Sequence, residues 1–287
     1  MKRIKLLLAL SGWMCMALAY GQQYSSNSGA KDIGLQLYSL RDDCSKDFQA
    51  TITAVGKMGY KYVEAANYSD DGKFYGLTPE AYKATVEAAG MKSLSSHTTK
   101  IIPVADLKTV DWEKIWEWWD ACIDAHKLAG MKYIVAPSMP NNFKTLSDLQ
   151  IYCDYYNKIG EKCNAKGIRF GYHNHSYEFE KVEGKIMYDY LIENTNPALV
   201  CFQMDVYWVV RGQQSPVKYF QKYPGRFELL HIKDHEELGQ SGMVGFDAIF
   251  NNIDKSGANY LIVEVEKYNY TPKESVQKSL DYLLKIL

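Results

Sequence analysis

Several signatures of other protein classes are scarce or missing in this chain of 287 residues. The charged residues nearly balance, and a net charge of -1 gives no electrostatic reason to bind nucleic acid. The six cysteines form no C-x-x-C pair and no spacing of a zinc framework. No stretch rich in Pro, Gly and Ser marks a linker between domains, and no Gly-rich loop marks a phosphate site. These absences argue against a nuclease, a zinc-framework protein and a chain of several domains.

An apolar run long enough to span a membrane comfortably is also missing, although a shorter run stands near the start. Lys2 and Arg3 precede an apolar stretch that ends at Leu18, and small residues follow it. This order is typical of a secretory signal peptide, with an uncleaved anchor as the alternative. We predict a signal peptide over residues 1–21, a flexible segment over 22–31 and export to the periplasm, with no membrane contact after cleavage.

Glycines recur along the rest of the chain in one setting, at the end of a helix-like stretch and shortly before a short apolar run. A glycine in a left-handed turn commonly ends a helix, and a strand buried on both faces reads as a continuous apolar run. The six glycines are Gly59, Gly90, Gly130, Gly167, Gly225 and Gly257. Two further apolar runs, at Ile33–Leu40 and Val200–Val206, bring the expected strands to eight. Eight strand-then-helix units predict a single-domain (β/α)8 barrel, the TIM barrel of the α/β class, over residues 32–287.

The cysteines can be interpreted against this fold. A barrel of this size needs no disulfide bonds for its stability. Cleavage of the signal peptide would leave an odd number of cysteines: Cys44, Cys122, Cys153, Cys163 and Cys201. We therefore expect buried free thiols.

Polar side chains gather at the predicted strand ends, where the active sites of such barrels lie. These residues are Glu64, His97, His173, His175, Asp205, His231, Glu264 and Glu266. Any one of them alone would more often be a hydrogen-bonded structural residue. Because strands five to eight are neighbours in the ring, however, their ends converge on one pocket. A mixed imidazole and carboxylate site for one divalent metal ion is expected there, and Mn, Zn, Co, Ni, Fe or Mg would suit it.

The order of these residues resembles a known family. The motifs are Tyr172-His173-Asn174-His175, Met204-Asp205-Val206-Tyr207-Trp208, His231-Ile232-Lys233-Asp234 and Val263-Glu264-Val265-Glu266. Together they are similar to the xylose-isomerase-like TIM-barrel superfamily of sugar phosphate isomerases and epimerases, and they look like its secreted branch from gut Bacteroidetes. The resemblance covers essentially the whole mature chain. It implies a carbohydrate substrate and one divalent metal, held here by Asp205, His231 and Glu264.

The fifth strand departs from the family pattern. Ketose 3-epimerases of the superfamily carry a glutamate there, which exchanges protons together with the glutamate of the eighth strand. This chain has His173 and His175 instead, with Glu178 further along. We take His173 as the fourth metal ligand, with His175 or Glu178 as substitutes. The departure argues against the two-glutamate epimerase mechanism.

The expected chemistry is removal of a proton next to the carbonyl of a keto-sugar, with a metal stabilising the resulting charge. The acid and base candidates are Glu264, His175, Glu178 and Lys233. Return of the proton would make the protein an isomerase or epimerase. Loss of a neighbouring leaving group would make it a lyase, or in reverse a hydratase, acting on 3-keto-glucosides or their 2-hydroxyglucal elimination products. A non-catalytic sugar-binding protein is a third alternative, against which the intact metal ligands argue.

Polar and aromatic side chains near the strand ends suit a small carbohydrate as the partner of this protein. The expected substrate-binding residues are Gln36, Glu64, His97, Trp208, Arg211 and Glu266. An exported enzyme meets few sugar phosphates, so a neutral keto-sugar or glycoside is preferred. The sequence allows an oligomer without specifying one.

Overall fold

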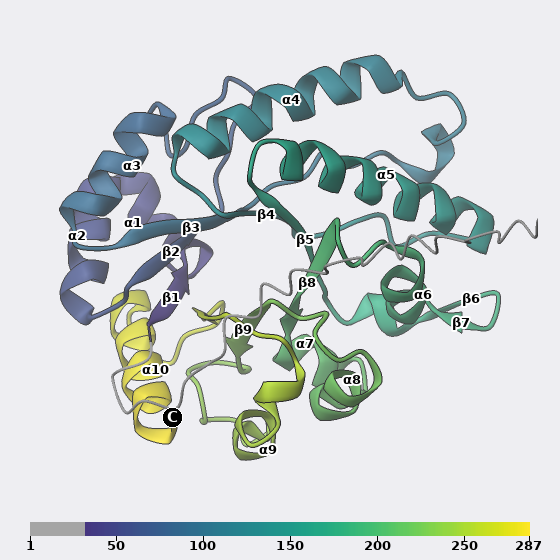
Figure 1. Ribbon diagram of the computed structural model, residues 1–287. Coiled ribbons are helices and arrows are strands. Elements are labelled where there is room, and N and C mark those ends of the chain that lie inside the picture. The colour runs from purple at the N-terminus through teal and green to yellow at the C-terminus, as the bar shows by residue number, and fades with distance from the viewer. Residues whose placement is uncertain (1–31) are drawn as a thin grey trace, which may run out of the picture.

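The computed structural model describes residues 32–287. The signal peptide expected over 1–21 and the flexible segment expected over 22–31 lie outside the described residues. Eight parallel strands close into a barrel in the ring order β1-β10-β9-β8-β5-β4-β3-β2 (Figure 1). They are β1 (Ile33–Gln36), β2 (Tyr62–Ala65), β3 (Lys92–His97), β4 (Tyr133–Ala136), β5 (Arg169–His173), β8 (Val200–Asp205), β9 (Leu229–Lys233) and β10 (Tyr260–Glu264). The predicted single-domain (β/α)8 barrel is confirmed.

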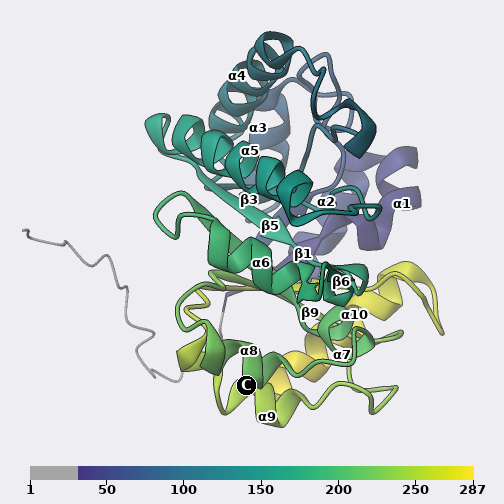
Figure 2. The same ribbon diagram turned by 90° about the vertical axis from the view of Figure 1, so that its right-hand side faces the viewer.

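Helices connect the strands and surround the barrel (Figures 1 and 2). The α-helices are α1 (Arg41–Lys46), α2 (Phe48–Met58), α3 (Pro79–Ala88), α4 (Trp112–Leu128), α5 (Leu146–Ala165), α6 (Met187–Asn194), α7 (Val206–Arg211), α8 (Pro216–Lys222), α9 (Phe246–Phe250) and α10 (Pro272–Ile286). The 3-10 helices are η1 (Leu37–Leu40), η2 (Val104–Asp106), η3 (Tyr177–Phe179) and η4 (Ile253–Lys255). A small hairpin of β6 (Lys181–Val182) and β7 (Lys185–Ile186) lies between β5 and α6.

The glycines that marked the helix ends have the expected backbone conformation. All six have a positive φ angle, a region that side chains other than that of glycine seldom enter. Gly59, for example, is the C-cap of α2 with φ 110°. At Gly257 close packing adds to this requirement, because a Cβ atom there would lie 2.7 Å from the Cα of Gly225.

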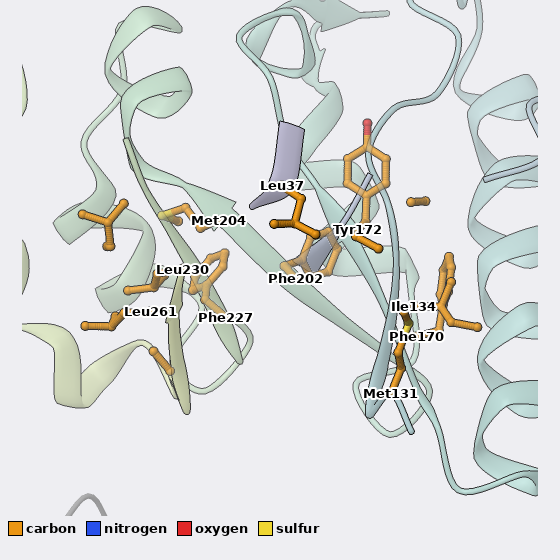
Figure 3. Close-up of a cluster of buried hydrophobic side chains, with 14 of the residues drawn as sticks. Leu37, Met131, Ile134, Phe170, Tyr172, Phe202, Met204, Phe227, Leu230 and Leu261 are labelled. Atoms are coloured by element: carbon orange, nitrogen blue, oxygen red, sulfur yellow. The ribbon is translucent and has the colours of Figure 1, made fainter. Parts of the chain in front are cut away.

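Each barrel strand turns alternate side chains outward and inward. Outward residues such as Phe202 and Leu230 pack in the main hydrophobic core (Figure 3). A separate group of inward residues forms an apolar layer: Leu94, Tyr133, Val135, Cys201, Leu229 and Ile262. Two residues further along β8, β9 and β10, the same face carries Gln203, His231 and Glu264. The barrel interior thus changes from apolar to polar toward the C-terminal ends of the strands.

Three strands end earlier than the apolar runs indicate. β1 ends at Gln36, whose side chain accepts a hydrogen bond from the backbone N–H of Tyr38 as the chain turns into η1. β8 ends at Asp205, whose carboxylate caps α7. β5 ends at His173, so His175 lies in the following loop. The functional side chains therefore stand at the rim where strands give way to helices and loops.

The five cysteines of the described part are buried free thiols, as expected. Burial raises the pKa of Cys163 to about 12, so this thiol stays protonated. Within residues 32–287, no helix combines the length and the apolar character that crossing a membrane requires.

Candidate functional site

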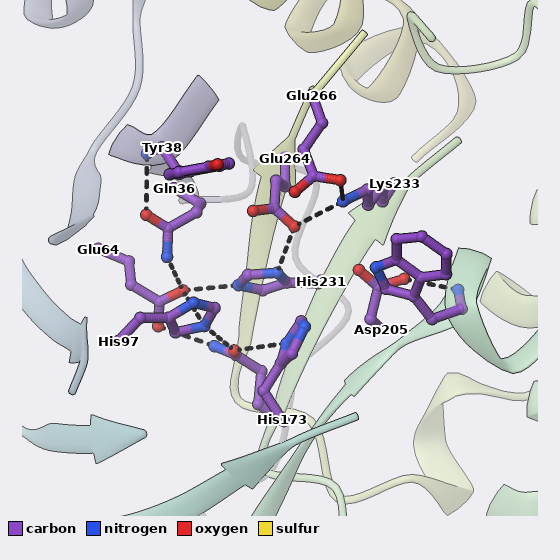
Figure 4. A network of polar contacts seen from close by, with 12 residues as sticks. Gln36, Tyr38, Glu64, His97, His173, Asp205, His231, Lys233, Glu264 and Glu266 are labelled. Atoms are coloured by element: carbon purple, nitrogen blue, oxygen red, sulfur yellow. Dashed lines mark hydrogen bonds and ion pairs between the residues drawn. The ribbon is translucent and has the colours of Figure 1, made fainter. Parts of the chain in front are cut away.

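Four side chains from the neighbouring strands β5, β8, β9 and β10 converge inside the mouth of the barrel (Figure 4). They are His173, Asp205, His231 and Glu264, here called the four-residue cluster. Their potential ligand atoms all lie within 4.8 Å of one another, and all four residues are buried. The structure thus brings together the four residues that the sequence suggested as metal ligands.

Asp205 leaves one carboxylate oxygen without a partner. Its Oδ1 accepts a hydrogen bond of 2.9 Å from the backbone N–H of Trp208 at the start of α7. Its Oδ2 is buried, and no residue among 32–287 donates a hydrogen bond to it. Burial raises the pKa of Asp205 to about 7, although the nearby Lys233 ammonium acts in the opposite direction. A buried oxygen in this state needs a proton or a cation.

His231 stands between two carboxylates. Its Nε2 lies 2.6 Å from Oε1 of Glu64, and its Nδ1 lies 3.3 Å from Oε2 of Glu264. Burial alone would lower the pKa of His231, but the two carboxylates raise it to about 10. The short gap between Nδ1 and Glu264 is therefore a place where a positive charge is stabilised.

His173 is a neutral imidazole. Its Nδ1 lies 3.1 Å from Oε1 of Gln203. Burial lowers its pKa well below the usual range, and the neighbouring His231 and His97 lower it further. A neutral imidazole with one nitrogen occupied in this way has its other nitrogen available as a ligand.

A divalent cation fits the four-residue cluster on these grounds. The cluster offers two imidazoles and two carboxylates, whose formal charges would balance a charge of +2. Mixed nitrogen and oxygen donors suit Zn and the neighbouring transition metals, while Mn also accepts such a set. The unpartnered Oδ2 of Asp205 and the gap between His231 and Glu264 are two independent positions that a cation would satisfy.

Lys233 brings a fixed positive charge beside the cluster. Its Nζ donates to Oε2 of Glu264 at 3.1 Å and also to Oε2 of Glu266. Burial opposes its charge, but Glu264, Asp205 and Glu266 raise its pKa above the usual range. The ammonium lies 5.2 Å from the ring centroid of Trp208. Lys233 therefore acts on the site as a stable cation, which orients Glu264.

His175 and Glu178, the suggested acid and base groups of the β5 loop, occupy different positions. The ring of His175 lies 5.0 Å from that of His173 and 5.5 Å from that of Trp208. Its Nδ1 is buried without a partner in the described chain, and burial lowers its pKa to about 4. Glu178 accepts hydrogen bonds from Tyr172 Oη at 2.6 Å and from the backbone N–H of His175 at 2.9 Å. His175 thus borders the cluster, whereas Glu178 holds the loop in place.

The residues expected to bind substrate fall into two groups by burial. Gln36 and Glu64 are fully buried and hydrogen-bond to each other at 2.8 Å, and Glu64 also contacts His231 of the cluster. The others are less buried. His97 contacts Glu64 at 3.1 Å, and Trp208 and Glu266 both adjoin Lys233. Arg211 is exposed and donates to the hydroxyl of Tyr207, which in turn contacts His235.

Gln203 was not among the residues that the sequence suggested. It lies two positions before Asp205 on β8, in an otherwise apolar run, so both side chains are on the same face of the strand. This spacing is the pattern from which Gln203 could have been predicted as a site residue. Its amide bridges Glu64 and the imidazoles of His97 and His173.

A cavity of about 350 Å³ opens between η1, α1 and the loop after β2, and none of the four cluster residues lines it. Tyr38, Arg41, Asn67 and Tyr75 are among its lining residues. Tyr38 connects this cavity with the buried Gln36, because its backbone N–H donates to the Gln36 side chain. The guanidinium of Arg41 lies 4.8 Å from the ring centroid of Tyr38.

Comparison with known proteins places this site in a family. The sequence pattern of the family described as "Xylose isomerase-like TIM barrel" matches residues 52–286. The chain belongs to this family. A solved structure of a sugar phosphate isomerase/epimerase from Parabacteroides distasonis ATCC 8503 is 34% identical, with a TM-score of 0.82 over 91% of this chain and 96% of that chain. The expected resemblance to proteins of the Bacteroidetes is therefore confirmed.

More distant relatives carry other activities. An inosose dehydratase from Lacticaseibacillus casei is 22% identical over 82% of this chain and 88% of that protein. Inosose dehydratase 1 from Bacillus cereus is 24% identical over 48% of this chain, and the match spans 58% of that protein. The zinc-binding protein IolI shares the fold at 13% identity, with a TM-score of 0.70 over 89% of this chain and 98% of that chain. The family member described here is an enzyme of the sugar isomerase and epimerase superfamily.

Proposed function

We propose that this protein is a divalent-metal-dependent enzyme that removes a proton next to the carbonyl group of a keto-sugar. The four-residue cluster carries the proposal, because its geometry and its unpartnered Asp205 oxygen suit a cation. IolI, a protein of the same fold, binds a zinc atom, and this supports the proposed dependence on a metal. Isomerisation or epimerisation is the reaction type that the Parabacteroides relative favours.

The residues of the cluster divide the work between binding and proton transfer. His173, Asp205, His231 and Glu264 would hold the metal, which would supply positive charge next to the oxygen of a sugar carbonyl. Oε2 of Glu264 faces His231 and Lys233, whereas no described residue is hydrogen-bonded to Oε1. Oε1 is therefore the atom best placed to accept a proton from the substrate. Although burial opposes ionisation, Lys233 holds the pKa of Glu264 well below its usual range, so the base is charged at neutral pH.

Elimination or hydration at a 3-keto-glucoside is the second candidate function. The fifth strand contributes the imidazole of His173 rather than the second carboxylate that two-face proton exchange uses. His175 adds a neutral ring whose buried Nδ1 has no partner in the described chain, next to Trp208. Such a ring suits a hydrogen bond to a departing or entering oxygen. The dehydratase activity of two curated relatives fits this reaction class.

The cavity beside Tyr38 supports a substrate with a second part beyond the reacting ring. Its volume of about 350 Å³ exceeds the minimum that a small-molecule pocket requires. Aromatic walls at Tyr38 and Tyr75 suit the apolar face of a sugar or of an aglycone. We therefore favour a neutral keto-sugar or glycoside as the substrate class.

Turnover in deuterated water tests the proposal and separates its two branches. The metal-loaded enzyme would be incubated with a panel of keto-sugars and 3-keto-glycosides, and the products analysed by NMR and mass spectrometry. Deuterium at the carbon next to the carbonyl, with unchanged carbohydrate skeleton, supports isomerisation or epimerisation. Release of aglycone, or loss or gain of water, supports the lyase or hydratase. Absence of both deuterium exchange and turnover across the panel would contradict the proposed chemistry.

A further inference from the structure

The fully buried carboxylate of Glu64 on β2 lies beside His231 of the four-residue cluster and next to His97 (Figure 4). Its Oε1 accepts a hydrogen bond of 2.8 Å from Gln36, and its Oε2 accepts one of 2.6 Å from Ser95. The amide Nε2 of Gln203 donates to Oε2 at 2.8 Å, and Nε2 of His231 lies 2.6 Å from Oε1. The proposed proton transfer uses none of these contacts, so this concentration of donors needs another explanation.

The contacts of Glu64 determine where His231 carries its hydrogen. An ionised carboxylate only accepts hydrogen bonds, so a ring nitrogen at 2.6 Å from it must be the donor. The hydrogen therefore lies on Nε2 of His231. Nδ1 is then the nitrogen that would exchange its proton for a metal ion, and it is the atom that faces Glu264 at 3.3 Å.

Gln203 determines the hydrogen position of His173 by the same reasoning. Because its Nε2 donates to Glu64, its Oε1 must be the acceptor on the opposite side. Oε1 lies 3.1 Å from Nδ1 of His173 and 2.7 Å from Nε2 of His97. His173 accordingly carries its hydrogen on Nδ1 and leaves Nε2 as the unprotonated nitrogen.

We propose that Glu64 and Gln203 are positioning residues that fix the tautomers of both imidazoles, so that each presents an unprotonated nitrogen to the metal. The inference rests on the proposed metal site. One carboxylate on β2 thus orders His231 directly and His173 through the Gln203 amide. Hydrogen bonds to the outer nitrogen of a metal-bound histidine commonly fix its orientation and strengthen binding. The Glu64 side chain would therefore act on metal affinity without touching the metal.

Three substitutions, at Glu64 and at two residues that hydrogen-bond to it, test the inference. Glu64→Gln keeps the shape but presents an amide that can donate to Nε2 of His231, which favours the opposite tautomer. Gln203→Met removes the acceptor for His173 and keeps the side-chain length. Ser95→Ala is the matched control, because it removes a hydrogen bond to Glu64 without any contact to an imidazole. Circular dichroism and thermal unfolding would show which variants fold.

The readouts are zinc affinity and the nitrogen NMR shifts of the zinc-loaded protein labelled in its histidine rings. In the wild type, zinc should bind through Nδ1 of His231 and Nε2 of His173. Glu64→Gln should weaken zinc binding by roughly 10- to 100-fold and disturb the His231 signals. Gln203→Met should disturb the His173 signals and weaken binding less. Ser95→Ala should leave the affinity within about threefold of the wild type and the NMR signals in place.

The possible results distinguish a failure of the metal site from a failure of the tautomer control. A wild-type protein that binds no zinc would overturn the proposed metal-dependent function and this inference with it. A wild type that binds zinc through the opposite ring nitrogens would overturn the inference alone. Equal zinc affinities for Glu64→Gln and Ser95→Ala would do the same. If Glu64→Gln does not fold, the comparison of Gln203→Met with Ser95→Ala decides, and equal affinities there also overturn it.

Discussion

At the scale of single residues, Asp205 serves two structures at once. One carboxylate oxygen caps α7, and the other is buried without a partner in the described chain. The cap fixes the orientation of the carboxylate. The second oxygen therefore stays at the cluster and cannot turn toward solvent. The buried, unpaired oxygen should lower the folding stability of the metal-free protein, and binding of a cation should raise it.

Asp205 makes the stability of the metal-free protein depend on pH. Its pKa of about 7 in the folded protein is above the ordinary value of 3.8, so its contribution is favourable at low pH and is lost as the pH rises through about 7. Compared with Asp205→Asn, the wild type should lose roughly 2–4 kcal/mol of unfolding free energy between pH 4 and pH 8, at about 1.4 kcal/mol per pKa unit. Urea unfolding with a chelator present measures this difference. Parallel pH profiles for the two proteins would show that Asp205 ionises freely.

Glu264→Gln should remove the proposed catalytic base while leaving the fold intact. The substitution keeps the size of the side chain but removes its charge and its proton affinity, so turnover should fall by at least ~100-fold. Glu161→Gln on the outer helix α5 is the matched control, because that side chain is 52% exposed and pairs only with Lys158 among the described residues. Turnover and metal content would be measured for both. Near-normal turnover of Glu264→Gln with its metal retained would exclude Glu264 as the base.

The residues of the cluster could be predicted from the sequence. The contacts that Glu64 and Gln203 make with the cluster could not. Asp205, His231 and Glu264 each interrupt an apolar run near the end of a predicted strand, and the barrel rule then places them together. The Glu64–Gln203 contact joins β2 and β8, which lie apart in the ring. Their relative heights depend on the stagger of the closed barrel, which no local pattern records.

At the scale of elements, helix-ending glycines mark where six of the eight strands start. These helix ends could be predicted from the sequence, because a backbone with a positive φ angle favours glycine at that position. The strand ends were less visible. At His173 and Asp205 the ladder gives way to contacts between side chain and backbone, made by Glu178 and by Asp205 itself. Apolar residues continue past Asp205 into α7, so hydrophobicity alone overestimates the length of β8.

Gly257 should be the most sensitive of these turns, because it combines positive φ with close packing. In Gly257→Ala, a Cβ would lie 2.7 Å from the Cα of Gly225, and the φ of 85° would be strained as well. Gly167→Ala provides the control, since it has φ 78° and nothing within 4 Å of the added atom. We expect Gly167→Ala to cost about 1–2 kcal/mol of unfolding free energy and Gly257→Ala clearly more. Equal losses in denaturant unfolding would mean that packing against Gly225 is easily relieved.

At the scale of the whole molecule, the barrel explains why distant residues form one site. The ring order places β5, β8, β9 and β10 side by side, so the convergence expected from strands five to eight is built into the topology. The same closure lets Glu64 on β2 reach across the interior to His231 on β9. The site therefore depends on an intact barrel more than on any single loop.

Export is the prediction that concerns the whole chain and its destination. We propose that residues 1–21 are a cleaved signal peptide, because a basic start, an apolar stretch and small residues follow one another there. Mass spectrometry of the protein recovered from fractionated cells should find a chain that starts after Gly21, in the periplasmic fraction. Recovery of the uncleaved chain from membranes would support an anchor in its place.

Anomalous X-ray diffraction tests most directly whether His173, Asp205, His231 and Glu264 bind a metal. Crystals grown with excess zinc would be measured on both sides of the zinc absorption edge. We predict one strong anomalous peak inside the barrel mouth, at roughly 2.0–2.3 Å from a nitrogen or oxygen of each of the four side chains. A well-ordered structure without an anomalous peak among these residues would contradict the metal site and the chemistry proposed from it.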